Sequence, residues 1–286
     1  MDKIKFAFFG TPDVASQTLD ILRANGYLPS LIITAPDKRA GRDLKISPSP
    51  VSIWAKKNNI LCLKPEKLDG DFLEKLFSLT VEKGINIYIV VAYGKILPEN
   101  LIKYPKLKSI NIHYSILPKY RGASPLESAI LSGETETGVT IQEIEYKLDS
   151  GPILDSKKIK LDINTTKAEL KNELIKEGAN LLIEVLPKIE NGQIKKINQK
   201  ESEATFCRKI KKEDGLISPN ENDLENWNKY RAFFGWPGVY FFTTKRDKEI
   251  RLKITKASFK DNKFIIERVI PENKKEISYS DFLKQN

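Results

Sequence analysis

The segment Ser109–Ser115, with the sequence Ser-Ile-Asn-Ile-His-Tyr-Ser, contains the single histidine of the 286-residue chain, His113. Because successive side chains of a β-strand point to opposite faces, Asn111, His113 and Ser115 would share one face while the residues between them face the core. This places an amide, an imidazole and a hydroxyl side by side where a strand enters a loop. A lone histidine is more often structural than catalytic, but three polar side chains at the start of a loop favour a functional site.

A carboxylate that could act with this imidazole is Asp149, in the turn Leu148-Asp-Ser-Gly-Pro152. Asp is common in turns, because its side chain bonds to nearby backbone groups. It could also orient the imidazole of His113 and favour its charged form. The spacing alone does not decide between the two roles.

The sequence lacks the residues that several classes of chemistry need. Phe9-Gly-Thr-Pro12 follows the first apolar run but is not a G-x-G-x-x-G fingerprint, so a dinucleotide is not supported. The chain also has no G-x-x-x-x-G-K-[ST] loop for nucleotide hydrolysis. One histidine and two isolated cysteines, Cys62 and Cys207, leave too few ligands for a zinc site, and we predict no metal.

Three further features concern the location of the protein. The two cysteines lack C-x-x-C spacing and fit the reduced thiols of a cytoplasmic protein. The first residues show no basic region followed by an apolar one, so a secretory signal is not expected. The longest apolar run, Ile85–Ala92, is too short to cross a bilayer. We predict a cytoplasmic protein with no membrane partner.

The first half of the chain alternates short apolar runs with amphipathic ones, which predicts a Rossmann-like α/β domain with a mostly parallel sheet. The expected strands are Ile4–Phe9, Ser30–Thr34, Ile85–Ala92, Ser109–Tyr114, Gly138–Glu145 and Ile153–Ile159. The expected helices are Val14–Ala24, Phe72–Lys83, Pro125–Leu131 and a long one from Thr166 to about Leu186, which begins with the capping box Thr166-x-x-Glu169. Such sheets bind ligands at the carboxyl ends of their strands.

A second, smaller domain is predicted after a polar and basic linker. We expect a catalytic domain over residues 1–190, the linker over 191–212 and the second domain over 213–286. The second domain contains an amphipathic segment, a Trp-Pro-Gly turn and three strand-like runs: Asp223–Phe233, Trp236–Gly238, Val239–Thr244, Glu249–Ala257 and Lys263–Val269. Short strands with little helix predict a small barrel or sandwich, here taken as an OB-like β-barrel.

The formal net charge is +10, which fits either a lysine-rich composition or a polyanionic partner. Basic residues are concentrated between Pro36 and Lys57, where Asp37 and Asp43 are the acidic residues and the basic ones are Lys38, Arg39, Arg42, Lys45, Lys56 and Lys57. This stretch is either a solvated surface loop or a segment that contacts phosphates.

Five stretches resemble the methionyl-tRNA formyltransferases, within the wider folate-dependent formyltransferases. They are Phe9–Asp13, Pro36–Arg42 with Pro48–Pro50, Val91–Pro98, Asn111–Ala123, and Gly133–Thr140 continuing to Leu148–Gly151. A weaker sixth stretch, Arg231–Tyr240, lies in the second domain. The Asn-x-His…Leu-Pro…Asp set points to formyl transfer, whereas the Pro36–Arg42 loop and the Trp-Pro-Gly turn point to the tRNA branch.

The resemblance implies a set of roles for named residues. Asn111, His113 and Asp149 would act together in moving the formyl group of 10-formyltetrahydrofolate to an amine, without a metal. The folate would lie near Val91, Tyr93, Gly94, Ile96 and Leu97, and its site would also be lined by Ser115, Ile116, Leu117 and Pro118. The acceptor arm of an initiator methionyl-tRNA would be contacted by Lys38, Arg39, Arg42 and Lys45. We expect a monomer.

Two other functions are compatible with parts of the sequence. The same catalytic set could formylate a sugar-nucleotide amine or hydrolyse the formyl-folate, but those relatives need no basic tRNA-binding module. A non-catalytic RNA-binding protein on the same fold is disfavoured by the intact Asn111, His113 and Asp149 set.

Overall fold

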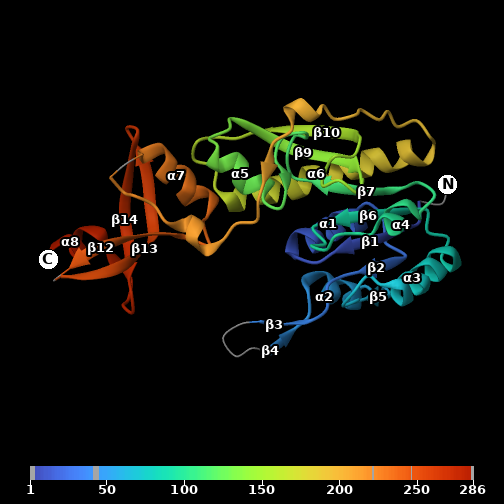
Figure 1. The fold of residues 1–286 in the computed structure, drawn as a ribbon, viewed down its shortest axis with the longest axis horizontal. Coiled ribbons are helices and arrows are strands. Elements are labelled where there is room, and N and C mark those ends of the chain that lie inside the picture. The colour runs from blue at the N-terminus through green and yellow to red at the C-terminus, as the bar shows by residue number, and fades with distance from the viewer. Residues whose placement is uncertain (1–3, 41–44, 221, 246, 285–286) are drawn as a thin grey trace. The chain divides into compact units, whose positions relative to one another are not determined.

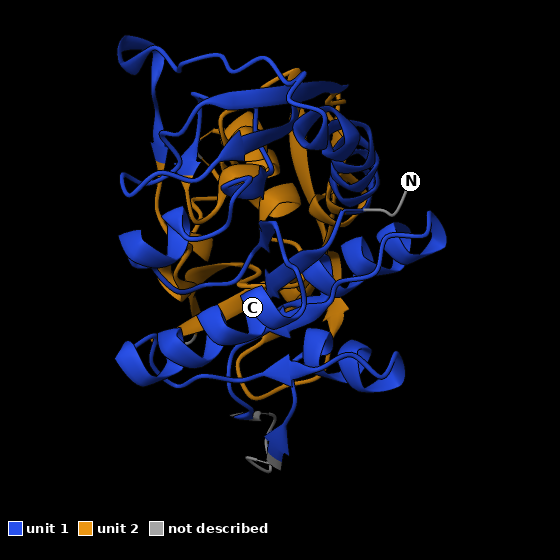
Figure 2. Ribbon diagram, turned by 90° about the vertical axis from the view of Figure 1, so that its right-hand side faces the viewer, with its two compact units in different colours: residues 1–121, 138–159, 172–206 blue, residues 122–137, 160–171, 207–286 orange. Residues whose placement is uncertain are grey.

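The structure is a computed structural model, and it describes residues 4–40, 45–220, 222–245 and 247–284. The chain forms two compact units (Figure 2). Unit 1 consists of residues 1–121, 138–159 and 172–206, and unit 2 of residues 122–137, 160–171 and 207–286. Within the described ranges, no helix is both long and apolar enough to cross a membrane.

Unit 1 is built on a seven-stranded sheet whose strands lie in the order β10-β9-β7-β6-β1-β2-β5 (Figure 1). The strands are β1 (Phe6–Gly10), β2 (Leu31–Ile33), β5 (Cys62–Leu63), β6 (Ile87–Val91), β7 (Ser109–His113), β9 (Glu136–Glu143) and β10 (Ile153–Lys160). The strands from β5 to β7 pair in parallel, and β9 pairs antiparallel with β7. The predicted α/β domain with a mostly parallel sheet is thereby confirmed.

The helices of this unit connect the parallel strands, as parallel pairing requires. They are α1 (Asp13–Ala24), α2 (Pro50–Lys57), α3 (Gly70–Glu82) and α4 (Glu99–Lys103). The long helix α6 (Lys167–Glu190) follows β10 and ends four residues beyond the predicted Leu186. The expected capping box is present, because Thr166 N donates to Glu169 Oε2 at 2.8 Å and Glu169 N donates to Thr166 Oγ1 at 3.3 Å.

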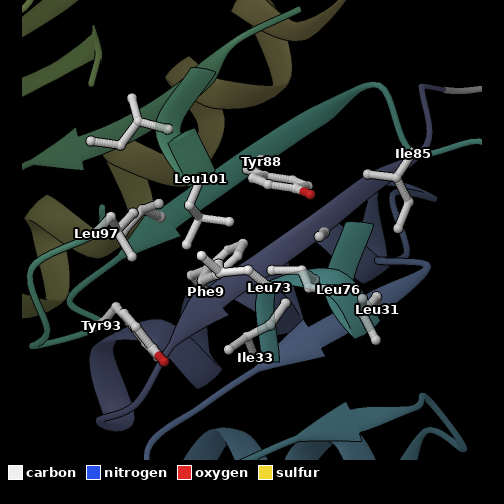
Figure 3. Close-up of a cluster of buried hydrophobic side chains, with 13 residues drawn as sticks. Phe9, Leu31, Ile33, Leu73, Leu76, Ile85, Tyr88, Tyr93, Leu97 and Leu101 are labelled. Carbon is white, nitrogen blue, oxygen red and sulfur yellow. The ribbon is translucent and has the colours of Figure 1, made fainter. Parts of the chain in front are cut away.

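One face of the unit 1 sheet packs against α3 and α4 in a buried apolar cluster (Figure 3). Its side chains include Phe9, Leu31, Ile33, Leu73, Leu76, Ile85, Tyr88, Tyr93, Leu97 and Leu101. Each fully buried large apolar side chain stabilises the fold by about 1.5–3 kcal/mol. The cluster therefore fixes the carboxyl ends of β1 and β6, from which the neighbouring loops start.

The basic stretch after β2 forms a separate two-stranded ribbon. Strands β3 (Lys38–Ala40) and β4 (Lys45–Ser47) pair antiparallel, with Lys38 opposite Ser47. The predicted linker is also structured: it contains β11 (Phe206–Cys207) and the short 3₁₀ helix Glu201–Glu203, and residues up to 206 belong to unit 1.

Unit 2 contains a four-stranded antiparallel sheet in the order β12-β13-β14-β15. Its strands are β12 (Val239–Lys245), β13 (Lys248–Lys260), β14 (Lys263–Pro271) and β15 (Ile277–Ser278), and its helices are α5 (Pro125–Leu131), α7 (Asp223–Ala232) and α8 (Tyr279–Lys284). On α7, Trp227 stacks on Phe259 with ring centroids 5.9 Å apart. The predicted β-rich second domain is confirmed: among the described residues, its strands form a four-stranded antiparallel sheet.

Candidate active site

The polar face of β7 extends onto its antiparallel neighbour β9. In the register of the two strands, Asn111 lies opposite Gln142 and His113 lies opposite Thr140. Directly opposed residues of an antiparallel pair point to the same face of the sheet. Two strands thus contribute four polar side chains to one surface at the end of β7.

The other face of β7 is apolar, as the alternation predicts. Ile110 and Ile112 are buried. Helix α6 approaches this face at Gly178, where an added Cβ would lie 3.0 Å from Ile112 and 3.5 Å from the ring of Tyr114. The close approach of the helix fixes the strand and hence the direction of its polar side chains.

The His113 ring has an oxygen atom beside each of its nitrogens. Its Nε2 lies 2.9 Å from the carbonyl oxygen of Tyr120, a hydrogen-bond distance, and its Nδ1 lies 3.7 Å from Asp149 Oδ2, which is an ion-pair distance. His113 is only 4% exposed. Asn111, two residues earlier on the same face, makes no side-chain hydrogen bond within the described parts of the chain and is partly exposed. Its amide is therefore available to a ligand.

Asp149 lies in a strained turn that is held by its neighbours. Its φ of 47° is in the left-handed region, which residues other than Gly adopt at a cost. Gly151 packs so closely that an added Cβ would lie 1.9 Å from the carbonyl oxygen of Glu143. Gln142 Nε2 donates to Asp149 Oδ1 at 3.0 Å, which leaves Oδ2 facing His113. The two roles that the sequence left open for Asp149, turn residue and partner of the imidazole, are both compatible with this geometry.

The loop that follows β7 is fixed by hydrogen bonds of its own. Ser115 Oγ donates to the carbonyl of Lys119 at 2.6 Å, and Thr140 Oγ1 donates to the carbonyl of Ser115 at 2.7 Å. Leu117 N donates in turn to Thr140 Oγ1 at 3.2 Å. Ser115 and Leu117 are buried, whereas Ile116 and Pro118 are partly exposed. Of the four residues predicted to line the folate site, Ile116 and Pro118 therefore offer the accessible surface.

The loop after β6 lies at the same edge of the sheet, because β6 and β7 are neighbouring parallel strands. Within the described residues, the backbone N–H groups of Gly94–Leu97 have no hydrogen-bond acceptor. The Tyr93 hydroxyl is buried without a hydrogen-bond partner among those residues, and burial raises the pKa of Tyr93 to about 12. It therefore remains a neutral donor.

This loop also presents apolar surface. Ile96 is 86% exposed, whereas Val91 and Leu97 are buried. Unused donors beside exposed apolar surface fit a flat heterocycle such as a pterin, since small-molecule sites combine apolar walls with a few fixed polar groups.

Three of the residues predicted to contact tRNA, Lys38, Arg39 and Lys45, lie on the β3–β4 ribbon, which follows β2 in the chain. Lys38 is exposed at the start of β3, and the backbone of Arg39 and Lys45 is placed in β3 and β4. Arg42 lies outside the described residues. At the base of the ribbon, Asp37 Oδ1 pairs with Lys64 Nζ at 2.8 Å.

In the described part of the chain, no group of three or more His, Cys, Asp or Glu side chains could hold a metal ion.

Two residues beside the site were not foreseen. Gln142 contacts the Asp149 carboxylate, and Gln199 contacts the backbone of the same turn. The polar alternation of β9 is a signal that could have drawn attention to Gln142. Nothing in the sequence around Gln199 distinguishes it from the polar linker in which it was placed.

Comparison with known families identifies the class of enzyme that has this mostly parallel sheet, namely enzymes that transfer a formyl group. A model described as formyl transferase matches residues 3–186, and one described as formyl transferase, C-terminal domain, matches residues 209–267. The chain belongs to the formyl transferase family, which confirms the predicted resemblance.

Relatives within this family carry a more specific name. The methionyl-tRNA formyltransferase of Sulfurihydrogenibium sp. (strain YO3AOP1) is 40% identical over 249 residues, covering 87% of this chain and 79% of the relative. The protein of the same name from Staphylococcus aureus (strain JH1) is 38% identical over 249 residues, covering 87% of this chain and 78% of the relative.

Solved structures share the fold at lower identity. A Helicobacter canadensis N-formyltransferase in complex with folinic acid and dTDP-3-aminofucose has a TM-score of 0.66 and 22% identity, covering 90% of this chain and 88% of that one. A methionyl-tRNA formyltransferase from Clostridium thermocellum has a TM-score of 0.60 and 16% identity, covering 96% of this chain and 99% of that one. These two likenesses concern the fold alone.

Proposed function

We propose that this protein transfers the formyl group of 10-formyltetrahydrofolate to the free amino group of initiator methionyl-tRNA, for translation initiation. The observation that carries the chemistry is the buried His113, which lies between the Asp149 carboxylate and the Tyr120 carbonyl and beside the available Asn111 amide. The choice of acceptor is supported by the names of relatives 38–40% identical over most of the chain.

Attack of an amine on a formyl carbon produces a tetrahedral species with negative charge on oxygen. Asn111 and protonated His113 are proposed to donate hydrogen bonds to that oxygen, and removal of one such donor typically costs about 3–4 kcal/mol of transition-state stabilisation. Because Asp149 faces Nδ1 of His113, the ring would donate through Nε2, which exchanges the Tyr120 carbonyl for the oxyanion during the reaction. Asp149 would stabilise the imidazolium and help a water molecule to accept the proton that the amine sheds. When the tetrahedral species collapses, the carbon–nitrogen bond to the folate carrier breaks and that nitrogen takes up a proton.

The folate carrier is proposed to lie between the loops that follow β6 and β7. The unused N–H groups of Gly94–Leu97 would bind its ring, and Ile116 and Pro118 would contact its apolar surface. These groups provide binding and orientation, and the carrier supplies the activated formyl group.

The tRNA is proposed to contact the basic β3–β4 ribbon through Lys38, Arg39, Arg42 and Lys45. Phosphate contacts of this kind position a nucleic acid without reading its sequence. Since initiator tRNA is used in translation, we further propose that the protein acts in the cytoplasm. We also propose that it is a monomer.

An assay with labelled formyl-folate and three acceptor conditions tests the proposal. Purified protein would be given charged initiator tRNA, a nucleotide-linked amino sugar, or no acceptor. Label in N-formylmethionyl-tRNA is the expected result. Transfer to the sugar amine, or release of formate without an acceptor, would move the assignment to the two alternative activities. Binding of tRNA without any transfer would indicate a non-catalytic RNA-binding protein.

A further inference from the structure

We propose that Gln199 is a positioning residue for catalysis, which fixes the Asp149 turn so that its carboxylate faces His113. The inference rests on the proposed role of Asp149 in formyl transfer. All the residues involved belong to unit 1.

The side-chain amide of Gln199 bonds directly to the turn. Its Nε2 donates to the carbonyl oxygens of Asp149 at 2.9 Å and Gly151 at 2.7 Å, and lies 3.3 Å from Gln142 Oε1. An amide nitrogen has two hydrogens, so the two shorter contacts are the direct bonds and the third is weaker. Because Asp149 has a left-handed backbone, the turn needs such external bonds to persist.

Arg121 determines which way the Gln199 amide points. The Arg121 Nε and Nη2 atoms donate to Gln199 Oε1 at 3.1 and 2.9 Å, and the Arg121 side chain is fully buried. A guanidinium can only donate hydrogen bonds, so the oxygen of the amide must face Arg121 and its nitrogen must face the turn.

A second link joins the same two segments at the surface. Glu201 Oε1 pairs with Arg121 Nη2 at 2.9 Å, and Glu201 Oε2 pairs with Lys147 Nζ at 2.6 Å. Lys147 lies two residues before Asp149, so the segment that carries Gln199 holds both sides of the turn.

The network reaches both nitrogens of the imidazole. Tyr120, the residue before Arg121, places its carbonyl oxygen 2.9 Å from His113 Nε2. The Arg121 side chain acts through Gln199 on Asp149, whose Oδ2 faces His113 Nδ1. Removal of the Gln199 donors would therefore loosen the backbone that carries Asp149 on one side of the ring, although Gln142 still bonds to its carboxylate. The hydrogen bond on the other side of the ring would stay in place.

Gln199→Glu is the most informative substitution, because it keeps the shape and the acceptor for Arg121 but replaces the donors to the turn with an acceptor. Misplacement of a catalytic group by about 1 Å can cost about 100-fold in rate, so we expect kcat to fall by about 10- to 100-fold. The KM values for folate and amine should change little, since Gln199 is not among the residues proposed to bind either substrate. Lys200→Ala is the matched control, because Lys200 is exposed and pairs with Glu203; its kcat should be that of the wild type.

A double-mutant cycle with Asp149→Asn separates positioning from a general structural role. If Gln199 acts through Asp149, Gln199→Glu should change kcat by less than about 2-fold in the Asp149→Asn protein. Effects that multiply in the double variant would overturn the inference, as would wild-type kcat in Gln199→Glu alone. If Gln199→Glu fails to fold by circular dichroism, Gln199→Met, which is neutral and lacks donors, takes its place in the same cycle.

The outcomes also separate this inference from the proposed function. The assignment of tRNA as the acceptor fails if the wild type instead formylates a sugar amine or hydrolyses the formyl-folate. The double-mutant cycle is then measured with that reaction, and it still tests whether Gln199 positions Asp149. Near-normal kcat in Asp149→Asn would overturn both the proposed role of Asp149 and the positioning role of Gln199.

Discussion

The carboxyl edge of the unit 1 sheet and the β3–β4 ribbon, whose strands are labelled in Figure 1, are two regions of one unit that are built in opposite ways. At the sheet edge, His113 is buried and flanked by acceptors, and Asp149 is held by Gln142 and Gln199. The ribbon pairs only with itself among the described strands, and its Ile46 is 70% exposed. The first surface fixes a few groups in place, whereas the described charge of the second, that of Lys38, is exposed to solvent.

This difference predicts which kinetic parameter each region controls. In a buried network, each group has one position, so its removal changes the geometry of the reacting atoms. Exposed charges attract phosphates over a distance and are screened by salt. Substitutions at the sheet edge should therefore lower kcat, and substitutions on the ribbon should raise the KM for tRNA and alter its salt dependence.

The largest effect is expected for His113→Ala. Since no other imidazole exists in the chain, kcat should fall by at least about 100-fold, the usual scale for general acid–base and oxyanion groups. The melting temperature and folate binding should be largely kept, because the ring is not part of the apolar cluster behind the sheet. Steady-state kinetics and a folate titration, run beside a thermal melt, measure these properties. Near-normal turnover would refute the mechanism.

Asp149→Asn should have the next largest effect. Asn tolerates the left-handed backbone of this position, so the turn should survive while the negative charge beside His113 is removed. We expect a strong decrease of kcat, together with a shift of the pH–rate profile of the remaining activity. Thermal melts measured in parallel provide the control. Preserved kinetics with a modest decrease of stability would show that Asp149 is a turn residue only.

The sequence predicted those elements of the fold that depend on residues close together in the chain. The strands β1, β6 and β7 and the helices α1 and α3 were expected within about three residues of their observed bounds, because each strand is a short buried run and each helix buries an apolar stripe. Helix α2, strand β5 and helix α4 were not expected, and they are short, with 8, 2 and 5 residues. For α2, a local signal existed: Ser49 Oγ accepts a hydrogen bond from Ser52 N at 3.0 Å, and Pro50 occupies the first turn.

The candidate site likewise contains features that depend on neighbouring residues and features that depend on long-range contacts. Strand alternation placed Asn111 and His113 on one face, since that depends only on neighbouring residues. The pairing of β9 with β7, which brings Gln142 opposite Asn111, is a long-range contact that the alternation does not encode. Gln199 lies in a polar stretch that was interpreted as a linker, and its place in the network depends on Arg121, which is distant in the chain. The assignment of individual residues to folate and tRNA contacts remains a prediction.

Arg42→Ala should have a smaller effect, and on a different parameter. The basic stretch to which Arg42 belongs is not part of the seven-stranded sheet, so stability and folate binding should be unchanged. The KM for charged tRNA should rise, and the log–log slope of tRNA binding against salt should become shallower by about one unit for each phosphate that the variant no longer neutralises. Kinetics and binding at several salt concentrations would measure both. Lys75→Ala, which removes an exposed charge from α3, is the matched control.

Unchanged kinetics toward tRNA at every salt concentration would mean that the basic stretch is only a solvated surface. The ribbon would then not control the KM for tRNA, and the assignment of the acceptor would shift toward a small amine.

The smallest effect is expected at Glu201, an exposed residue that bonds to the buried Arg121. Hydrogen bonds from Arg121 and Lys147 lower the pKa of Glu201 to about 2, from an ordinary value of 4.5. A carboxylate with a lowered pKa in the folded state stabilises that state above its unfolded pKa, and this contribution disappears as the pH falls through the folded value. The stabilisation by Glu201 should therefore be complete above about pH 4.5 and vanish toward pH 2.

Urea denaturation of the wild type and Glu201→Gln at several pH values tests this expectation. The midpoint of the variant should be slightly lower at neutral pH, because exposed ion pairs contribute little, and the difference should vanish near pH 2. Glu203→Gln removes the same charge from the same segment but touches Lys200 and not Arg121, so its midpoint should stay close to that of the wild type. A difference between Glu201→Gln and the wild type that persists at pH 2 would show that the carboxylate charge is not what links Glu201 to the Arg121 network. Glu201 would then be linked to Arg121 and Lys147 by contacts that do not depend on its charge.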